Sequence, residues 1–504
     1  MYTGALSAIT NIDKMKNIKQ KMKIVAVFLL IITGVSTLYA QELGANFNEN
    51  IDKANPVLIS DLNAKWYRGF VNVPSQCLNI SSDGTVTGVD NTSIENLSGV
   101  NSLIASKGVT VHNMPTKLIF SLKMAFTTKN MGVPSVGTSE MGYVMQSIVK
   151  LLTHKNFGAY IDVLAVGNEP MWETPTEDAD KYEAFLNLLI DKVDSLRLTN
   201  HWNYEIYAGA INKANSNKTH AILLKVLKIA AENPKVVGLD VHEHVTQLSE
   251  AENDIKYIRN TLKFSKKMMC TEFSLVWLWN AHISDTLGNW GNTNGYSSSL
   301  KMYEWLNVLM QKSYTGTPVT PEHFYSYFAS TSWYPKNWFQ TFYNIFRKYS
   351  FSQATYGAQN LPINKALTTT SDLWTVNFIC NGTYLGLDTN NLGNKNPLVY
   401  PMYKHITDSL YSIPSSTKDK KMPTVAYHIS HNQGKSILNI DGIAPENKLE
   451  IDIYNLKAQR VYSQLVASMP TSINLYEYGI TKGMYLLSIN DRKMNVFNHK
   501  IIIK

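Results

Sequence analysis

The sequence predicts an α/β chain in two parts, a (β/α)8 TIM barrel followed by a small all-β sandwich domain. Three observations carry this prediction. Short apolar runs typical of strands alternate with helical stretches over residues 41–412. Residues 413–424 are polar and charged and contain two prolines, as is typical of a linker. Residues 425–504 hold short β-type runs, which turn residues separate at near-regular spacing.

The composition is that of a globular protein. Of its 504 residues, 44% are hydrophobic and 17% are charged, which is too apolar for a disordered chain. Three cysteines without a CxxC pair exclude a disulfide scaffold and a zinc knuckle. The net charge of +8 is small for this length, so we expect no nucleic-acid partner.

Residues 1–40 are predicted to be a signal peptide. Five lysines between positions 14 and 23 precede the apolar run 24–35, and the small residue Ala40 stands before Gln41. The apolar run is shorter than the ~20 residues that a membrane-spanning helix needs. We therefore expect cleavage after Ala40, export through the periplasm, and no membrane span in the mature chain.

Eight runs are predicted to be barrel strands, because apolar and β-branched residues dominate them. They are 43–47, 66–73, 117–124, 161–167, 204–210, 236–241, 267–273 and 323–328. Helical stretches with apolar residues at three- and four-residue steps lie between them. Examples are 141–152, 180–196, 219–232, 250–262 and 298–311.

Such alternation favours parallel strands, and eight units fit a barrel. A doubly wound sheet is the alternative, but no glycine-rich phosphate loop follows an early strand. Segment 336–397 is expected to be a long insertion between strand eight and the last helix; a separate small β domain is the other interpretation.

Two glutamates stand at the ends of predicted strands. Glu169 ends strand four within Asn168-Glu169-Pro170, and Glu272 ends strand seven. Barrel enzymes place their chemistry at this end of the strands, and a carboxylate there is costly unless it is solvated, paired or used. We therefore expect the two side chains to face each other across the barrel mouth.

An Asn-Glu-Pro sequence on strand four, with a second strand-end glutamate on strand seven, resembles glycoside hydrolase clan A. These are retaining TIM-barrel enzymes that act on β-linked glycans, and the resemblance covers roughly residues 41–412. It implies that Glu169 is the acid/base, that Glu272 is the nucleophile, and that Asn168 binds the sugar 2-hydroxyl.

The chemistry of retaining hydrolysis agrees with this resemblance. It needs two carboxyl groups about 5–5.5 Å apart, one ionised and one protonated. Two like charges this close raise one pKa, which we expect to keep Glu169 protonated. Taken alone, Glu169 is also consistent with a carboxylate in the first turn of a helix that begins at Pro170.

Other residues are candidates for binding substrate. The resemblance implies that Arg68 steadies the nucleophile and that His242 or His244, on strand six, contacts it. The HxH pattern is also typical of a metal pair, but metal-dependent barrels of the amidohydrolase type carry HxH on strand one, which has no histidine here. We therefore expect no catalytic metal and no cofactor.

Tryptophans in the loops after the strands are candidates for sugar subsites, because aromatic faces match the C–H face of a pyranose. Trp333 follows predicted strand eight, and the resemblance implies that it forms the floor of a subsite. Trp172 and Trp277 follow strands four and seven. Packing in the core is the alternative for each.

The C-terminal region resembles the sorting domain of the type IX secretion system. The matching segments are 451–455 (IDIYN), 482–487 (KGMYLL) and the closing 500–504 (KIIIK). A small carbohydrate-binding or immunoglobulin-like sandwich is the alternative. The resemblance implies that the secretion machinery is a partner and that the protein is secreted or attached to the cell surface.

The sequence thus predicts a secreted retaining glycoside hydrolase, acting on a β-linked poly- or oligosaccharide. Two alternatives stay open: a non-catalytic surface protein that binds glycans on a barrel scaffold, and a metal hydrolase that uses His242 and His244.

Overall fold

The computed structural model describes residues 42–411 and, in the C-terminal region, residues 428–432, 437–441, 449–455, 460–466, 471–475, 477–481, 483–490 and 496–503. The predicted signal peptide, 1–40, and the predicted linker, 413–424, lie outside the described residues. The chain divides into two compact units, 1–413 and 414–504. Within the described residues, no helix is long and apolar enough to cross a membrane.

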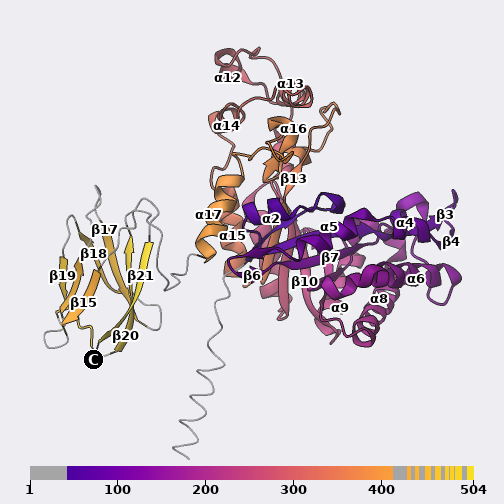
Figure 1. Ribbon diagram of the computed structural model, residues 1–504, viewed down its shortest axis with the longest axis horizontal. Helices are drawn as coiled ribbons and strands as arrows, with labels where there is room; N and C mark the ends of the chain where they lie inside the picture. The colour runs from indigo at the N-terminus through magenta and orange to yellow at the C-terminus, as the bar shows by residue number, and fades with distance from the viewer. Residues whose placement is uncertain are drawn as a thin grey trace, which may run out of the picture. The chain divides into compact units, whose positions relative to one another are not determined.

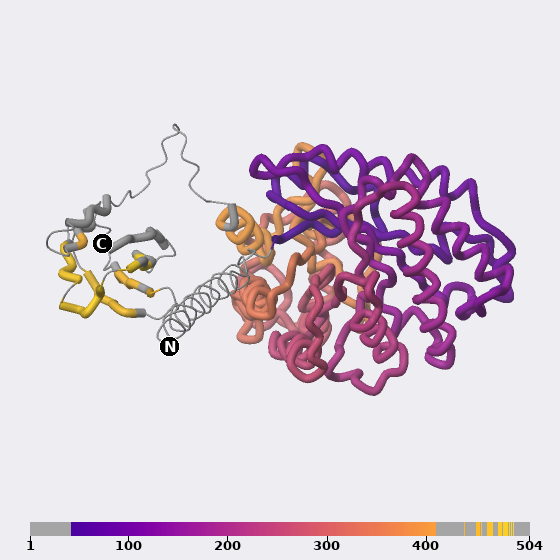
Figure 2. The backbone as a smooth tube through the Cα atoms, turned by 90° about the horizontal axis from the view of Figure 1, so that it is seen from below, coloured from indigo at the N-terminus to yellow at the C-terminus, as the bar shows by residue number. Residues whose placement is uncertain are grey.

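The first unit is a closed barrel of eight parallel strands, as the sequence predicts (Figure 1). In chain order the strands are β1 (Glu42–Asn46), β2 (Trp66–Asn72), β7 (Lys117–Lys123), β8 (Val163–Val166), β9 (Glu205–Asn212), β10 (Val236–His244), β11 (Lys267–Ser274) and β12 (Gln353–Gly357). The pairing of β1 with β12 closes the ring, so the indigo start and orange end of this unit meet (Figure 2).

A helix follows each strand before the next one begins, which gives the parallel direction. These helices are α2 (Pro56–Asp61), α5 (Ser98–Ser106), α6 (Ser139–Thr153), α8 (Ala179–Thr199), α9 (Ala221–Glu232), α10 (Leu248–Lys256), α15 (Trp338–Lys348) and α17 (Tyr400–Tyr411). The predicted helices at 141–152, 180–196, 219–232, 250–262 and 298–311 are all present, the last as α13 (Met302–Tyr314) in a loop.

The loops carry further short elements. After β2 come α3 (Val73–Cys77), β3 (Leu78–Ile80), β4 (Val86–Val89) and α4 (Asn91–Glu95), and a hairpin of β5 (Thr110–Val111) and β6 (Met114–Pro115) precedes β7. Between β11 and α15 lie α11 (Val276–Ala281), α12 (Gly288–Thr293), α13 and α14 (Pro321–Ser330). After β12 come β13 (Gln359–Asn360), β14 (Cys380–Asn381) and α16 (Gly382–Leu385).

The predicted eighth strand at 323–328 is wrong, because these residues belong to helix α14. Thr320 caps this helix by accepting a hydrogen bond from the His323 backbone N–H, and Pro321 stands at its first position. The true eighth strand, β12, reads QATYG. It has no apolar run, because Gln353 and Thr355 point into the barrel and bond to strand β11 there.

The expected insertion at 336–397 is wrong in its bounds, since this segment contains helix α15 and strand eight. The chain instead makes two excursions, one between β11 and α15 and one between β12 and α17. They pack together, and the Ser313 hydroxyl of α13 donates a hydrogen bond to the Gly382 carbonyl 2.5 Å away. Figure 1 shows α12, α13, α14 and α16 gathered in one region of this unit.

The second unit is a β-sandwich, as predicted. One sheet has the order β15–β16–β19 and the other β18–β17–β20–β21, all antiparallel. The strands are β15 (His428–Asn432), β16 (Ile437–Asp441), β17 (Leu449–Tyr454), β18 (Arg460–Val466), β19 (Thr471–Asn474), β20 (Gly483–Asn490) and β21 (Val496–Ile503). Leu438 and Ile473 of one sheet share a buried core with Ile451 and Leu487 of the other.

Candidate active site

Apolar side chains fill the interior of the barrel near the amino-terminal ends of the strands. Polar side chains fill it nearer the carboxyl ends. Trp66, Ile119, Ala165, Tyr207 and Met269 form an inner cluster. Side chains alternate along a strand, so the next inward positions toward the carboxyl ends belong to the polar residues. Arg68 and Ser121 hold such positions. Asn168 lies beyond the end of β8, and His242 and Glu272 stand at an irregularity in strand pairing that is described below.

Glu272 is bound by a buried arginine. Arg68 is fully buried, and its Nη1 lies 2.5 Å from Glu272 Oε1. The same guanidinium donates to Asn168 Oδ1 at 2.9 Å and to Ser121 Oγ at 3.1 Å. Burial opposes ionisation of Glu272, but the charges of His242 and Arg68 outweigh it and hold the pKa of this carboxyl well below its usual value. Glu272 is therefore an ionised carboxylate.

An irregularity in strand β11 turns two consecutive side chains toward the site. Val241 pairs with Cys270 but His242 pairs with Glu272, so Thr271 is an extra residue in the register. Thr271 and Glu272 both bond to site residues, whereas Cys270 packs in the outer core. Cys270 therefore does not share the face of Glu272, although it lies two residues before it. Burial raises the pKa of the Cys270 thiol well above its usual value, so it stays protonated.

Glu169 leaves the end of strand β8 in a left-handed backbone conformation, with φ of 40°. It precedes the four-residue helix α7 (Pro170–Glu173), but its side chain caps none of the helix N–H groups. Instead Oε1 lies 3.1 Å from His242 Nδ1 and accepts from Asn212 Nδ2 at 3.2 Å. The carboxylate thus bonds to side chains at the barrel mouth and not to the helix. This disfavours the interpretation of Glu169 as a carboxylate that stabilises the first turn of a helix.

The raised pKa expected for Glu169 is not what the structure gives. Burial and the charge of Glu272 raise the pKa of Glu169. The hydrogen bond and charge of His242, together with the charge of His244, outweigh them, so that the pKa is lowered overall. For His242, burial lowers the pKa. The charge of Glu272 and the hydrogen bond to Glu169 outweigh burial, so the pKa of His242 is raised overall. The sequence-based expectation included the second carboxylate and left out the histidine between them.

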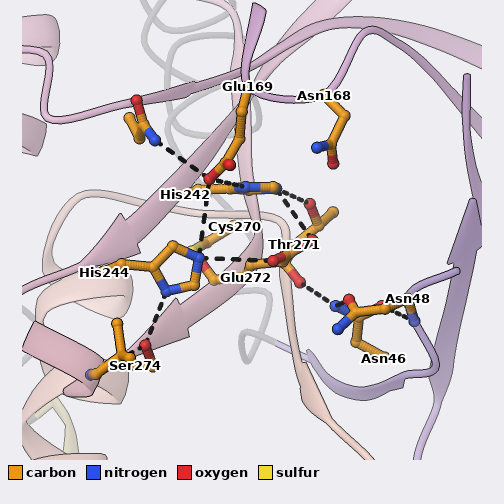
Figure 3. Close-up of polar contacts among 12 residues, drawn as sticks. Asn46, Asn48, Asn168, Glu169, His242, His244, Cys270, Thr271, Glu272 and Ser274 are labelled. Carbon is orange, nitrogen blue, oxygen red and sulfur yellow. Dashed lines mark hydrogen bonds and ion pairs between the residues drawn. The ribbon is translucent and has the colours of Figure 1, made fainter. Parts of the chain in front are cut away.

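His242 lies between Glu169 and Thr271 (Figure 3), and Thr271 links it to the buried Asp240. The Thr271 hydroxyl donates to Asp240 Oδ2 at 2.7 Å, so its oxygen is free to accept from His242 Nε2, 3.0 Å away. Because Nε2 carries a hydrogen, the contact between His242 Nδ1 and Glu169 Oε1 needs one more proton, on either atom. The site therefore holds one proton shared between Glu169 and His242.

His244 lies between the two glutamates. Its Nε2 is 3.9 Å from Glu169 Oε1 and 3.5 Å from Glu272 Oε2, and its Nδ1 is 2.8 Å from Ser274 Oγ (Figure 3). One imidazole nitrogen is thus within 4 Å of both carboxylates, which places them across a single small space. Glu169, His242 and His244 each offer a ligand atom within 4.8 Å of the others, so they could hold a metal ion.

Asn168 is fixed from both sides. Its Oδ1 accepts from Arg68, and its Nδ2 donates to Glu173 Oε1 at 3.0 Å. Lys123 Nζ is 3.2 Å from the same oxygen of Glu173. Burial raises the pKa of Glu173 to about 7 against the opposing charge of Lys123. One Asn168 N–H remains available for a ligand above the two glutamates.

Two of the three predicted tryptophans lie near this site. The Trp172 indole N–H donates to Asn212 Oδ1 at 3.1 Å, and its ring is 58% exposed. The Trp277 ring centroid is 5.9 Å from that of Trp374, which in turn packs edge-on against His244 at 4.8 Å. Trp172 and Trp374 therefore give the site exposed aromatic faces, with Trp277 half-buried beside Trp374.

The reason for assigning a subsite role to Trp333, its place directly after strand eight, is wrong. Trp333 follows helix α14 rather than strand eight, and it stacks on His282 at 4.1 Å within the excursion after β11. None of its ring contacts involves a residue that touches the two glutamates. Trp374, in the short 3-10 helix Trp374–Val376 after β12, is the tryptophan that follows strand eight and packs on His244.

Several side chains of the candidate site were not predicted from the sequence. Asp240 lies two residues before His242 on the same strand face, so alternation could have found it. Thr271 could not be found, because the register irregularity is invisible in the sequence. Asn212 and Glu173 carried no signal in a single sequence. Trp374 was missed because strand eight was misplaced.

Comparison with known proteins gives one family match. Residues 432–504 match the model of the secretion system C-terminal sorting domain. A search of curated proteins finds none that matches the chain.

Solved structures of similar shape are distant. A β-glucuronidase from Bacteroides uniformis is 8% identical with a TM-score of 0.39, and the match covers 92% of this chain and 46% of that one. A tri-modular endo-β-1,4-glucanase from Bacillus licheniformis is 12% identical with a TM-score of 0.39, covering 92% and 78%. A β-glucosidase from Pyrococcus furiosus is 10% identical with a TM-score of 0.37, covering 74% and 96%.

The chain thus spans about half the length of the first of these enzymes, and at such TM-scores none supports an argument about its chemistry. The closed barrel rests on its own strand pairing. The C-terminal match stands apart from these likenesses: residues 432–504 are a secretion system C-terminal sorting domain, which indicates export by the type IX secretion system.

Proposed function

We propose that the barrel is a retaining glycoside hydrolase that cleaves β-glycosidic bonds of a poly- or oligosaccharide. The observation that carries the proposal is the arrangement of Glu169 and Glu272 around His244 Nε2. Each carboxylate lies within 4 Å of this atom. Glu169 is bound to His242, and Glu272 is bound to Arg68. An ionised carboxylate opposite a second carboxyl group that shares a proton with His242 supplies the nucleophile and the acid that double displacement requires.

In the first step, Glu272 attacks the anomeric carbon and forms a glycosyl ester. The proton held between Glu169 and His242 passes from Glu169 to the leaving glycosidic oxygen, so the aglycone departs as an alcohol. Arg68 keeps Glu272 ionised until it attacks. The free N–H of Asn168 is placed to donate to a sugar hydroxyl beside the reacting carbon.

In the second step, Glu169 acts as a base. Ester formation removes the negative charge of Glu272, which is one of the causes that raise the pKa of Glu169. The pKa of Glu169 is therefore lower in the ester than in the free enzyme, and the proton that Glu169 next accepts is held less tightly. Glu169 takes this proton from water, and the hydroxide attacks the anomeric carbon. The ester breaks, Glu272 leaves as a carboxylate, and the proton returns to the Glu169–His242 pair.

The stereochemistry of the product tests this proposal. Proton NMR of fresh hydrolysate from aryl β-glycosides and β-linked polysaccharides should show the β-anomer first, because two inversions restore the configuration. A first-formed α-anomer would exclude double displacement. Wild-type protein that binds glycans but releases no product would favour the non-catalytic glycan-binding alternative.

We further propose that the sorting domain carries this activity out of the cell, either as a released enzyme or attached to the surface. An apolar leader at 1–40 and the C-terminal match together support export.

A further inference from the structure

The two histidines of strand β10 are oriented as metal ligands are. In metal sites the ligating histidine usually bonds through its other ring nitrogen to a carboxylate, carbonyl or hydroxyl, which fixes the ring. Here His242 Nε2 bonds to Thr271 Oγ1, which donates to Asp240, and His244 Nδ1 bonds to Ser274 Oγ. Both rings therefore present their remaining nitrogen to Glu169.

One of these nitrogens makes only long contacts, and these are with the two carboxylates. His244 Nε2 is buried and makes no hydrogen bond, although its residue is only 6% exposed. A buried polar atom without a hydrogen bond is costly. Its nearest polar neighbours are the two carboxylates, at 3.5 and 3.9 Å, which are acceptors when ionised. A cation bound to His244 Nε2 and Glu169 would satisfy this nitrogen and would bring positive charge close to Glu272.

The ligand spacing fits a small transition-metal ion. Zinc bonds of about 2.0–2.1 Å to nitrogen and oxygen in a tetrahedron put ligand atoms roughly 3.3 Å apart. Glu169 Oε1 lies 3.1 Å from His242 Nδ1 and 3.9 Å from His244 Nε2, and all three ligand atoms lie within 4.8 Å of one another. Two imidazoles and one carboxylate suit zinc, whereas calcium and magnesium prefer oxygen ligands.

We propose that Glu169, His242 and His244 form a binding site for a divalent transition-metal ion such as zinc, and that the bound ion blocks the acid/base group. The ion would occupy Glu169 Oε1, the atom that transfers the proton. The Glu169 side chain is 25% exposed, so the ion has an approach from the barrel mouth. The claim that the ion binds here, the binding half of the proposal, does not depend on the proposed glycosidase function. The claim that the ion blocks the acid/base group, the blocking half, rests on that function.

Zinc titration of the full chain tests the binding half. Calorimetry with zinc chloride should give a tight site in the wild type and at least ~100-fold weaker binding in His244→Gln. Ser274→Ala keeps all three ligands but frees the ring, and should lose 10- to 100-fold, the usual cost of removing an orienting partner. His201→Gln, an exposed histidine outside the site, is the matched control and should bind zinc like the wild type.

Equal zinc affinity in wild type and His244→Gln, or no binding by the wild type, would overturn the site. Thermal unfolding with excess chelator shows whether His244→Gln is folded; if it is not, Ser274→Ala decides, and unchanged affinity there overturns the orientation argument. Magnesium in place of zinc should give no heat above dilution.

Hydrolysis assays test the blocking half. Zinc should inhibit competitively against the glycan, and a chelator should restore the full rate. Stimulation by zinc would overturn the blocking half and favour the metal-hydrolase alternative. Absence of hydrolysis with every glycan would remove the blocking half together with the proposed function, while the titration would still decide the site.

Discussion

His242 Nδ1 lies 3.1 Å from Glu169 Oε1, and the hydrogen bond on the other side of the ring leaves one proton to be shared between these two atoms. This relationship differs from two carboxylates that keep a proton by mutual repulsion. The charge of Glu272 helps to keep that proton on the pair, because it raises the pKa of His242. Glu272, the proposed nucleophile, and Glu169, the proposed acid, are thereby coupled through one imidazole.

The pH profile of kcat/KM follows from this coupling. The pKa of Glu272 is held well below 4.5, so the acid limb should fall below pH 4.5. The shared proton is lost only when the pair deprotonates, and the pKa of His242 is raised above 6.5. The basic limb should therefore lie above pH 6.5. A basic limb below that value would show that His242 does not help to hold the catalytic proton.

Arg68→Lys tests whether Glu272 needs the guanidinium rather than only a positive charge. The three nitrogens of Arg68 bond to four different side chains, and a lysine ammonium cannot reproduce that planar fork. We expect kcat/KM to fall by about 100-fold, the loss of one or two charged hydrogen bonds. Arg197→Lys, at the Asp194 ion pair of helix α8, is the control and should leave kinetics unchanged. Equal kinetics in both variants would contradict the role of Arg68.

Trp374→Ala and Trp333→Ala separate the two positions for the subsite aromatic. Trp374 packs against His244 and is 39% exposed, so its loss should raise KM by about 10-fold or more, through the contact area of one indole. Trp333 stacks on His282 away from the glutamates and should affect stability rather than KM. The reverse pattern in steady-state kinetics would restore the sequence-based assignment.

Glu173→Gln should change how stability depends on pH. The pKa of Glu173 is about 7 in the folded chain against 4.5, so the folded state binds this proton more tightly than the unfolded state. Stability from this group is therefore full below pH 4.5 and is lost as pH rises to about 7. The loss amounts to roughly 3 kcal/mol in the wild type, and the variant should lack it. Urea unfolding at pH 5 and pH 8 measures the difference. Parallel pH dependence in both proteins would refute the assignment.

Most of the barrel could be predicted from the sequence, because seven strands and their helices carry strong hydrophobic periodicity. Glu169 and Glu272 could be found because each ends such a strand. Strand β12 could not, since its inward Gln353 and Thr355 satisfy polar groups of β11 instead of forming an apolar run. The aromatic-rich α14 took its place in the prediction, although its Thr-Pro start is a helix signal.

The electrostatics of the site could be predicted only in part. Two facing carboxylates suggest one raised pKa, but the lowered pKa of Glu169 depends on the distance to His242, which no pattern gives. The position of Thr271 depends on one extra residue in the pairing of β10 with β11. Such features arise from tertiary packing and leave no local trace in the sequence.

Covalent trapping tests the central claim most directly. Intact mass after incubation with 2-deoxy-2-fluoro glycosyl fluorides of several sugars should rise by one sugar, because the fluorine slows breakdown of the glycosyl ester. Peptide mapping should place the label on Glu272, and Glu272→Gln should take up none. A label on another carboxylate would contradict the assignment of Glu272, and a folded wild-type protein that hydrolyses glycans without ever forming a label on Glu272 would contradict the account.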